Sequence, residues 1–240
     1  TRYLYPELTE AAEALCSTLP GHLHKVFFVN SGSAATDLAL RMARIHTGRN
    51  DIAILENGYH GNTLPGIEVS DYKHSGKGGD GPPEHVLTLP LPKLFRGRFT
   101  SARAYVADAK QRILERIQAR RTPAALIAEP VSGCGGQVPL APGYLQALLP
   151  FLREHGILLL MDEVQTGFGR LGTPFWGFEL HEVIHDILIL GKPMGNGHPV
   201  AAVVTTEEVA DAFANGMEFF SSFGGNPVSC AVTTEVLRIL

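Results

Sequence analysis

The segment Ile157-Leu-Leu-Leu-Met-Asp162-Glu163-Val164-Gln165 decides the fold class. Its continuous apolar run is typical of a strand that is buried on both faces, as in a parallel sheet covered by helices. Similar short runs recur along the chain and alternate with longer segments of helical periodicity. This alternation is the pattern of β-α-β units. We therefore expect an α/β fold whose sheet is mostly parallel and has helices on both faces.

The same periodicities locate the other elements. We expect strands at Val26–Asn30, Ile52–Glu56, Ala124–Glu129, Ile157–Asp162, Ile187–Leu190 and Ala201–Thr205. We expect helices at Thr9–Leu19, Ala34–Thr47, Ala102–Arg120, Tyr144–His155 and Glu207–Asn215. Residues 71–100 are rich in Gly, Pro, Lys and His and show little periodicity, so they are expected to form a long excursion that could pass over an active site.

Composition narrows the class of protein. The chain has 240 residues, 45% of them hydrophobic, and a net charge of −4 without a run of Lys or Arg. It is therefore expected to form a globular domain that binds a small molecule, with neither nucleic acid nor membrane as a partner. The three scattered cysteines predict no disulfide framework, and no apolar run resembles a spanning helix or signal peptide, so a cytoplasmic location is expected. Because the chain starts at Thr1 and stops within the periodic segment Val228–Leu240, we expect an excerpt of a longer protein.

Two loops after predicted strands could hold the parts of a cofactor. Ser31, Gly32 and Ser33 lie where a strand gives way to a helix, and backbone N–H groups there suit a phosphate monoester. An ordinary helix N-cap would have the same sequence. After the next strand, Tyr59 could stack on a flat heteroaromatic ring beside His60, although such a turn is often only structural.

Asp162 lies at the end of the quoted strand, where an unpaired charge would be costly. A protonated pyridine nitrogen is a suitable partner, and the pairing would help the ring to accept electrons from a substrate carbanion. An apolar strand ending in Asp-Glu also occurs in ATPases, but the chain lacks the GxxxxGK[ST] phosphate loop that such enzymes need.

Lys192 follows another strand and is bracketed by Gly191 and Pro193. Such a lysine is usually solvated, but it lies roughly thirty residues beyond Asp162, which is enough for a crossover between neighbouring parallel strands. A lysine that forms a Schiff base must spend time deprotonated, and it can then act as a proton shuttle. Phosphate cradle, aromatic ring, carboxylate and amine together predict pyridoxal 5′-phosphate (PLP).

A zinc hydrolase is a remote alternative, because His181-Glu-Val-Ile-His185 matches the HExxH pattern. That signature needs both histidines on one continuous helix, whereas His185 leads directly into a strand of Leu and Ile. We therefore predict no metal site.

At these motifs the chain resembles the class III aminotransferases, PLP-dependent enzymes of fold type I, over nearly its whole length. The resemblance implies that Gly32 and Ser33 hold the cofactor phosphate, Tyr59 and Val164 cover the two ring faces, and Gln165 approaches the ring hydroxyl. It also implies that Asp162 pairs with the pyridine nitrogen, that Lys192 forms the Schiff base, and that Glu129 lies near the substrate. Ser222 stands where the family usually has a threonine that reaches the phosphate across a dimer interface. Ala34 replaces a glutamate of the family motif, which puts the local helix capping in doubt.

The resemblance leaves the reaction open. Within the family, residues 191–200 and 223–232 are similar to the branch that contains ethanolamine-phosphate and phosphohydroxylysine phospho-lyases as well as bacterial aminotransferases. The expected substrate is a primary amine that could carry a phosphate, which Lys73, Lys77, Arg96 and Arg98 of the excursion could meet. The resemblance further implies a homodimer with shared active sites. It implies that residues 1–240 are the PLP-binding large domain, with a small domain built from chain ends that are missing here.

Overall fold

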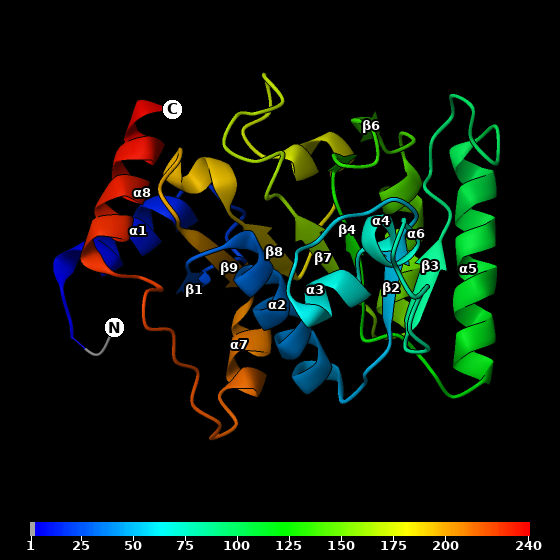
Figure 1. Ribbon diagram of the computed structural model, residues 1–240, viewed down its shortest axis with the longest axis horizontal. Helices are drawn as coiled ribbons and strands as arrows, with labels where there is room; N and C mark the ends of the chain where they lie inside the picture. Colours follow the sequence, from blue (N-terminus) through cyan, green and yellow to red (C-terminus); the bar gives the residue numbers. More distant parts are fainter. Residues whose placement is uncertain (1–2) are drawn as a thin grey trace.

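A seven-stranded sheet forms the centre of the molecule (Figure 1), in a computed structural model that describes residues 3–240. Its spatial order is β1-β9-β8-β7-β4-β2-β3. All neighbouring pairs are parallel except those that involve β9, which is antiparallel to both β1 and β8. The sheet is thus mostly parallel, as predicted. Its strands are β1 (Lys25–Val29), β2 (Ile52–Leu55), β3 (Val86–Leu89), β4 (Ala125–Ala128), β7 (Leu158–Asp162), β8 (Ile187–Leu190) and β9 (Ala201–Thr205).

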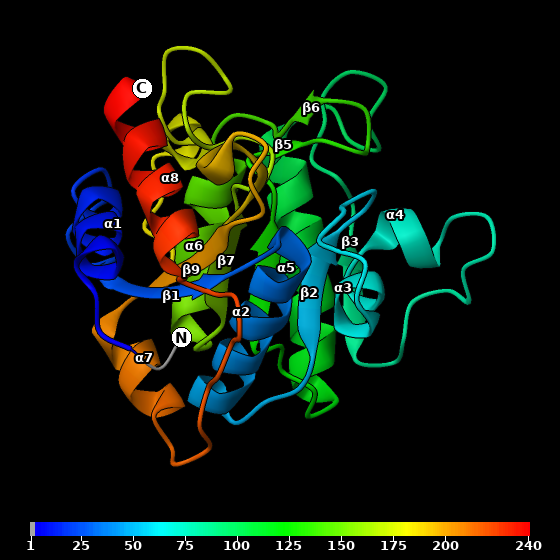
Figure 2. The ribbon, with the colours of Figure 1, turned by 60° about the vertical axis from the view of Figure 1, so that its left-hand side comes forward.

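Helices cover both faces of this sheet (Figure 2). One face packs against α2 (Gly32–Thr47) and α7 (Glu207–Phe213), and the other against α1 (Pro6–Cys16), α5 (Ala102–Gln118), α6 (Tyr144–Glu154) and α8 (Pro227–Ile239). Strand β7 shows why its sequence is apolar throughout: Leu158 and Leu160 enter the first core, while Leu159 and Met161 enter the second. Successive side chains of a strand point to opposite faces, so a central strand needs apolar residues at every position.

The predicted strands and helices are all present; two strands have the predicted bounds, and the ends of the other elements are shifted by up to three residues. Helix α1 begins at Pro6, three residues before the predicted start, because proline fits the first turn, where its missing N–H is not needed. The prediction for residues 71–100 was wrong in part, since they contain α4 (Asp71–His74) and the edge strand β3. The segment Val228–Leu240 was recognised only as periodic, and it forms helix α8, capped by the Asn226 side chain. The shorter elements are α3 (Leu64–Glu68), the hairpin of β5 (Val131–Ser132) and β6 (Val138–Pro139), and the 3₁₀ turns η1 (Gly177–His181) and η2 (Lys192–Gly195).

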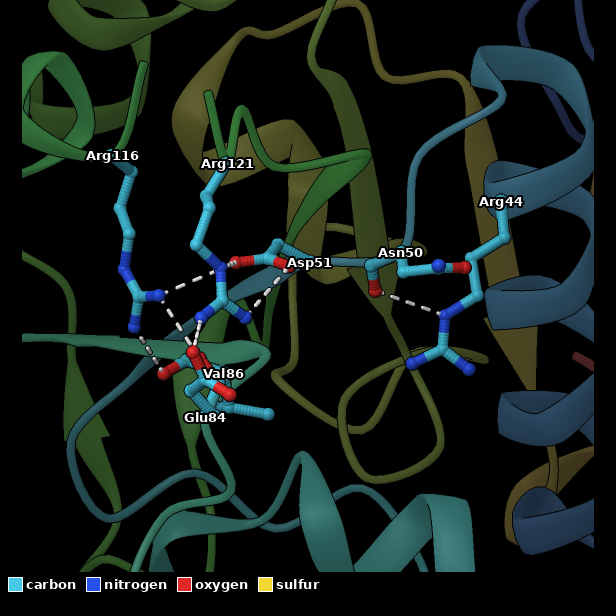
Figure 3. Close-up of polar contacts among 7 residues, drawn as sticks. All are labelled: Arg44, Asn50, Asp51, Glu84, Val86, Arg116 and Arg121. Carbon is cyan, nitrogen blue, oxygen red and sulfur yellow. Dashed lines mark hydrogen bonds and ion pairs between the residues drawn. The ribbon is translucent and has the colours of Figure 1, made fainter. Parts of the chain in front are cut away.

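A network of arginine hydrogen bonds and ion pairs lies at the edge of the sheet where the parallel strands begin (Figure 3). Asp51, just before β2, is buried and accepts hydrogen bonds from Arg121 Nε at 3.0 Å and from Arg116 Nη1 at 3.3 Å. Arg121 also binds the carboxylate of Glu84. Arg116 donates to the carbonyl oxygens of Glu84, just before β3, and of Val86, within β3. Helix α5 and its following turn are thereby tied to the starts of two strands.

None of the helices in residues 3–240 is long and apolar enough to cross a bilayer.

Candidate active site

A pocket opens at the opposite edge of the sheet, where the parallel strands end. This is the edge at which open α/β sheets bind ligands. The pocket is lined by residues from the loops after β1, β2, β4, β7 and β8, namely Gly32, Ser33, Tyr59, His60, Gly61, Glu129, Asp162, Val164, Gln165 and Lys192. Eleven residues were singled out in the sequence, and nine of them line this pocket. Of the other two, Ser31 lies one residue from the pocket wall, and Ser222 lies elsewhere on an exposed segment.

The N-terminus of α2 forms one wall of this pocket. Ser31 is the N-cap, and its hydroxyl accepts a hydrogen bond from Ala34 N at 3.2 Å, so the helix is capped despite the alanine at position 34. A side chain on Gly32 could not be accommodated, because its Cβ would lie 2.9 Å from Val164 Cγ1. Glycine therefore lets the start of α2 approach the loop after β7 closely.

The loop after β2 places Tyr59 and His60 in the pocket. Its backbone is anchored by Tyr59 N, which donates to Glu129 Oε2 at 3.3 Å, and by His60 N, which donates to Ser70 Oγ at 2.8 Å. Gly61 follows with a φ of 143°, and a Cβ there would lie 3.1 Å from the Cα of Ser33. Only glycine satisfies both conditions, which brings the Tyr59 loop against the start of α2.

Asp162 and His60 form a buried pair at the base of the site. Asp162 Oδ2 lies 2.7 Å from His60 Nδ1, and Oδ1 accepts from Val164 N at 3.1 Å. Burial opposes protonation of the imidazole, but the hydrogen bond and charge of Asp162, together with the charge of Glu129, outweigh it and raise the pKa of His60. The sequence had identified both residues without pairing them. The signal was available, since a carboxylate at a buried strand end needs a donor.

Glu129 is a second buried carboxylate in the same pocket. It lies just after β4, between the ends of β2 and β7, and Gly133 N donates to its Oε1 at 3.1 Å. Burial raises the pKa of Glu129 to about 7, against the charge of His60 and two backbone N–H donors, which favour the ionised form. Glu129 can therefore take up or release a proton near neutral pH.

Lys192 reaches the pocket from the end of β8, which pairs directly with β7. It has a φ of 21°, an unusual value for a residue with a side chain, in a turn that begins at Gly191. Gly191 is itself close to the start of α2, because a Cβ on it would lie 3.3 Å from Gly32 Cα. The amine and the Asp162 carboxylate, thirty residues apart in the chain, thus line one pocket.

The histidines of the zinc alternative do not form a metal site. His181 is the last residue of η1, and its Nε2 lies 2.8 Å from the carbonyl oxygen of Pro130. Glu182 then takes a left-handed conformation, so no helix continues to His185, which is buried against Phe178. Nowhere between residues 3 and 240 do three or more His, Cys, Asp or Glu side chains form a group that could hold a metal ion.

Comparisons with known proteins show the family of the chain. The family model of the class III aminotransferases matches residues 2–240. A Drosophila melanogaster protein named alanine–glyoxylate aminotransferase 2-like is 45% identical over 248 residues, covering 100% of this chain and 50% of that protein. A Caenorhabditis elegans protein named ethanolamine-phosphate phospho-lyase homolog 1 is 40% identical over 256 residues, covering 100% of this chain and 54% of that protein. The chain belongs to the class III aminotransferase family, and it spans about half the length of these curated relatives.

Solved structures share the fold. An Arthrobacter phospholyase in complex with phosphoethanolamine has a TM-score of 0.91 and 38% identity, covering 100% of this chain and 57% of that one. An amine transaminase from an uncultivated Pseudomonas species, in its PLP-bound form, has a TM-score of 0.87 and 32% identity, covering 100% and 58%. The predicted fold class, that of PLP-dependent enzymes of fold type I, is confirmed.

Proposed function

We propose that the full-length protein is a PLP-dependent transaminase that acts on a primary amine. One observation carries this proposal: Lys192 and Asp162 line the same pocket, together with Gly32 and Ser33 at the N-terminus of α2. When bound, PLP supplies an aldehyde that combines with amines and a ring that withdraws electrons from the substrate.

The chemistry of the pocket fits this cofactor. Asp162 uses one hydrogen bond on each carboxylate oxygen, and each oxygen has a further lone pair with which to accept a ring N–H. The glycines at positions 32 and 191 keep the wall formed by α2 free of side chains that would fill the space beside Val164. An anion placed at the start of α2 would meet the unpaired N–H groups of its first turn.

Most of the lining residues have a direct role in this proposal. The start of α2 and the Ser33 hydroxyl would bind the phosphate, Tyr59 and Val164 would cover the ring faces, and Asp162 would keep the ring nitrogen protonated. Gln165 would donate to the ring hydroxyl, and Lys192 would hold the cofactor covalently through its Nζ, as a Schiff base. When its Nζ is free, Lys192 can accept and return a substrate proton. Glu129 would face the substrate, and its near-neutral pKa suits it to a changing charge there.

We also propose that the described chain is the cofactor-binding large domain and that the enzyme is a homodimer. Residues 217–223 carry Met217, Phe220 and Phe223, whose side chains are 66%, 51% and 68% exposed. Such exposed apolar residues are typical of an interface, and Ser222 among them would reach the phosphate of the partner's site. Mixed dimers of Lys192→Ala and Ser222→Ala subunits test this, because each such dimer would contain one doubly altered site and one intact site. Recovered activity on mixing supports the shared site, and unchanged inactivity contradicts it.

A cytoplasmic location stays part of the proposal. It is supported by the cysteines, all three of which are free. The relevant measurement is fractionation of cells that express the tagged full-length protein, because a human relative, 37% identical, is named as mitochondrial.

The cofactor proposal is tested by adding PLP to the full-length protein. We expect a visible absorption band that borohydride bleaches, and we expect Lys192→Ala to lose it. Lys110→Ala is the matched control, because this lysine lies on α5 and lines no part of the pocket. His181→Ala should keep the band as well. A band that survives in Lys192→Ala would contradict the assignment of the lysine.

A phospho-lyase is the second candidate, because the Arthrobacter neighbour is a phospholyase solved with phosphoethanolamine. The two reactions differ in their products. Full-length enzyme incubated with ethanolamine phosphate should transfer the amino group to pyruvate or 2-oxoglutarate if it is a transaminase. Release of inorganic phosphate without any amino acceptor would overturn the transaminase proposal in favour of the lyase.

A further inference from the structure

Four basic side chains of residues 71–100 were candidates to bind an anionic substrate, and their surroundings in the structure differ. Arg98 forms an ion pair with Glu56 at 3.0 Å. Arg96 lies over the ring of Phe95 and lines a different, apolar hollow with residues 136–142. Lys77 is exposed in the loop after α4. Lys73 alone of the four lies beside a pocket residue, with its Nζ 5.7 Å from the centre of the Tyr59 ring.

The position of Lys73 is fixed by its own short helix. Helix α4 is bound to the Tyr59 loop by Asn57 N, which donates to Asp71 Oδ2 at 2.7 Å, and by Tyr72 N, which donates to Gly58 O at 3.1 Å. The rings of Tyr59 and Tyr72 also meet edge to face, with their centres 6.2 Å apart. Lys73 is therefore held at the pocket rather than carried on a free loop.

The ammonium group of Lys73 has no carboxylate within ion-pairing distance in the described part of the chain. Lys73 is half-buried, so part of its hydration is lost without an ion pair to compensate for it. The thiol of Cys134 gives a second indication of where Lys73 lies. Burial and the charge of Glu129 raise the pKa of this thiol, whereas the charges of Lys192 and Lys73 both act to lower it. The charges of both amines thus act on the same thiol.

We propose that Lys73 binds an anionic group at the end of the substrate remote from its reacting amine. The preferred substrates are then amines with a phosphate or carboxylate tail, and a dianionic phosphate gains most from a compact ammonium charge. This inference rests on the proposed function, because it assumes that the amine reacts at the PLP site. It assigns Lys73 to substrate specificity, separate from the cofactor phosphate at the start of α2.

The test uses full-length holoenzyme and the variants Lys73→Ala and Lys73→Arg. In single-turnover experiments the apparent second-order rate constant of the amine reaction is measured, from the change in the visible spectrum, for ethanolamine phosphate, β-alanine and neutral propylamine. For Lys73→Ala we expect this rate constant to fall by ~10–100-fold with the phosphate, by less with the carboxylate and by less than ~3-fold with propylamine, mainly through a weaker apparent affinity. Lys73→Arg should restore part of the loss. Added salt should weaken the preference for anionic amines in wild type and not in Lys73→Ala.

Lys77→Ala is the matched control. Lys77 is exposed and lies four residues after Lys73, so its removal deletes the same charge, and the variant should behave as wild type. An equal loss with anionic and neutral amines, or no preference for anionic amines in wild type, would overturn the inference. A weaker PLP band in Lys73→Ala would overturn it too, because Lys73 would then serve the cofactor. Failure of wild type to form any PLP band would instead contradict the proposed function, on which the inference rests.

Discussion

The buried carboxylates at the two edges of the sheet have different kinds of hydrogen-bond partner. Where the parallel strands begin, Asp51 is bound by two arginines, and Asp186 accepts from Arg153 and from Leu159 N. Where they end, Asp162 and Glu129 are equally buried, but their protein partners are one histidine and backbone amides. The first arrangement fixes strand ends. The second leaves free hydrogen-bond acceptors in a pocket, together with a glutamate, Glu129, whose pKa is raised to about 7 by burial, which is what a site for chemistry needs.

Asp162→Asn should have the largest effect, and on catalysis. The change keeps the shape of the side chain but removes the negative charge, so the loss of kcat in PLP-loaded full-length enzyme should be ~100–1,000-fold, as for other removed electrostatic groups. Pre-steady-state kinetics of the amine reaction would measure it. A kcat within a few-fold of wild type would mean that the charge at this edge has no catalytic purpose.

Asp51→Asn makes the same chemical change at the other edge and should act on stability. Arg116 and Arg121 would lose a buried partner, and the free energy of unfolding should fall by about 3 kcal/mol, the low end for a broken buried pair. Urea denaturation measures this loss. The kcat of the folded variant should be unchanged, and a large fall in kcat without loss of stability would remove the distinction between the edges.

Glu163 gives a pH-dependent test next to Asp162. Its oxygens accept from Gly177 N, Phe178 N and the Thr166 hydroxyl, and burial raises its pKa to about 7. A raised pKa means that the folded protein holds the proton more tightly than the unfolded chain does. Its contribution is therefore complete below about pH 4 and is lost as the pH rises to about 7.

Glu163→Gln should flatten the fall in stability between these limits by about 3 kcal/mol, because one unit of pKa shift corresponds to about 1.4 kcal/mol. Thermal denaturation of wild type and variant at a series of pH values measures the difference. Parallel profiles for wild type and Glu163→Gln would show that Glu163 titrates normally.

The pair of Glu56 and Arg98 should have the smallest effect. It lies at the strand-end edge, but its side chains are 33% and 48% exposed, so water screens the attraction. A double-mutant cycle with Glu56→Gln and Arg98→Gln should give a coupling energy of about 0.2–1 kcal/mol in urea denaturation. A coupling energy several times larger would indicate that this edge also contains a stabilising ion pair.

Most strands of the sheet could be predicted from the sequence, because buried strands are recognisable as unbroken apolar runs, as at Leu158–Asp162. It was less informative where structure depends on partners distant in the chain. Strand β3 is four residues long and lies within a segment rich in glycine and proline, so its pairing with β2 was not predictable from periodicity. Helix α8 could have been predicted from Asn226 and Pro227, which are an N-cap and a first-turn proline.

The candidate site likewise has features that local sequence predicts and others that depend on distant partners. The motifs around Gly32, Tyr59, Asp162 and Lys192 were recognisable because each follows a predicted strand, and parallel strands end at one edge. The pairing of His60 with Asp162 joins residues 102 positions apart and depends on the order of strands β2, β4 and β7. The selection of Lys73 among four cations likewise required the fold of α4. What the sequence lacked was strand order and loop conformation.

The cofactor residues and the proposed specificity residue Lys73 come from different parts of the fold, and this has an evolutionary consequence. Most residues proposed to hold the cofactor lie directly after strands of the buried sheet, whereas Lys73 lies on the short helix α4, farther along the connection between β2 and β3. A change of the side chain at position 73 would alter which amines bind, whereas a change in the backbone of α4 would also affect the Tyr59 loop, to which α4 is hydrogen-bonded. A lineage can in this way diversify its substrates through single surface residues, without altering its core.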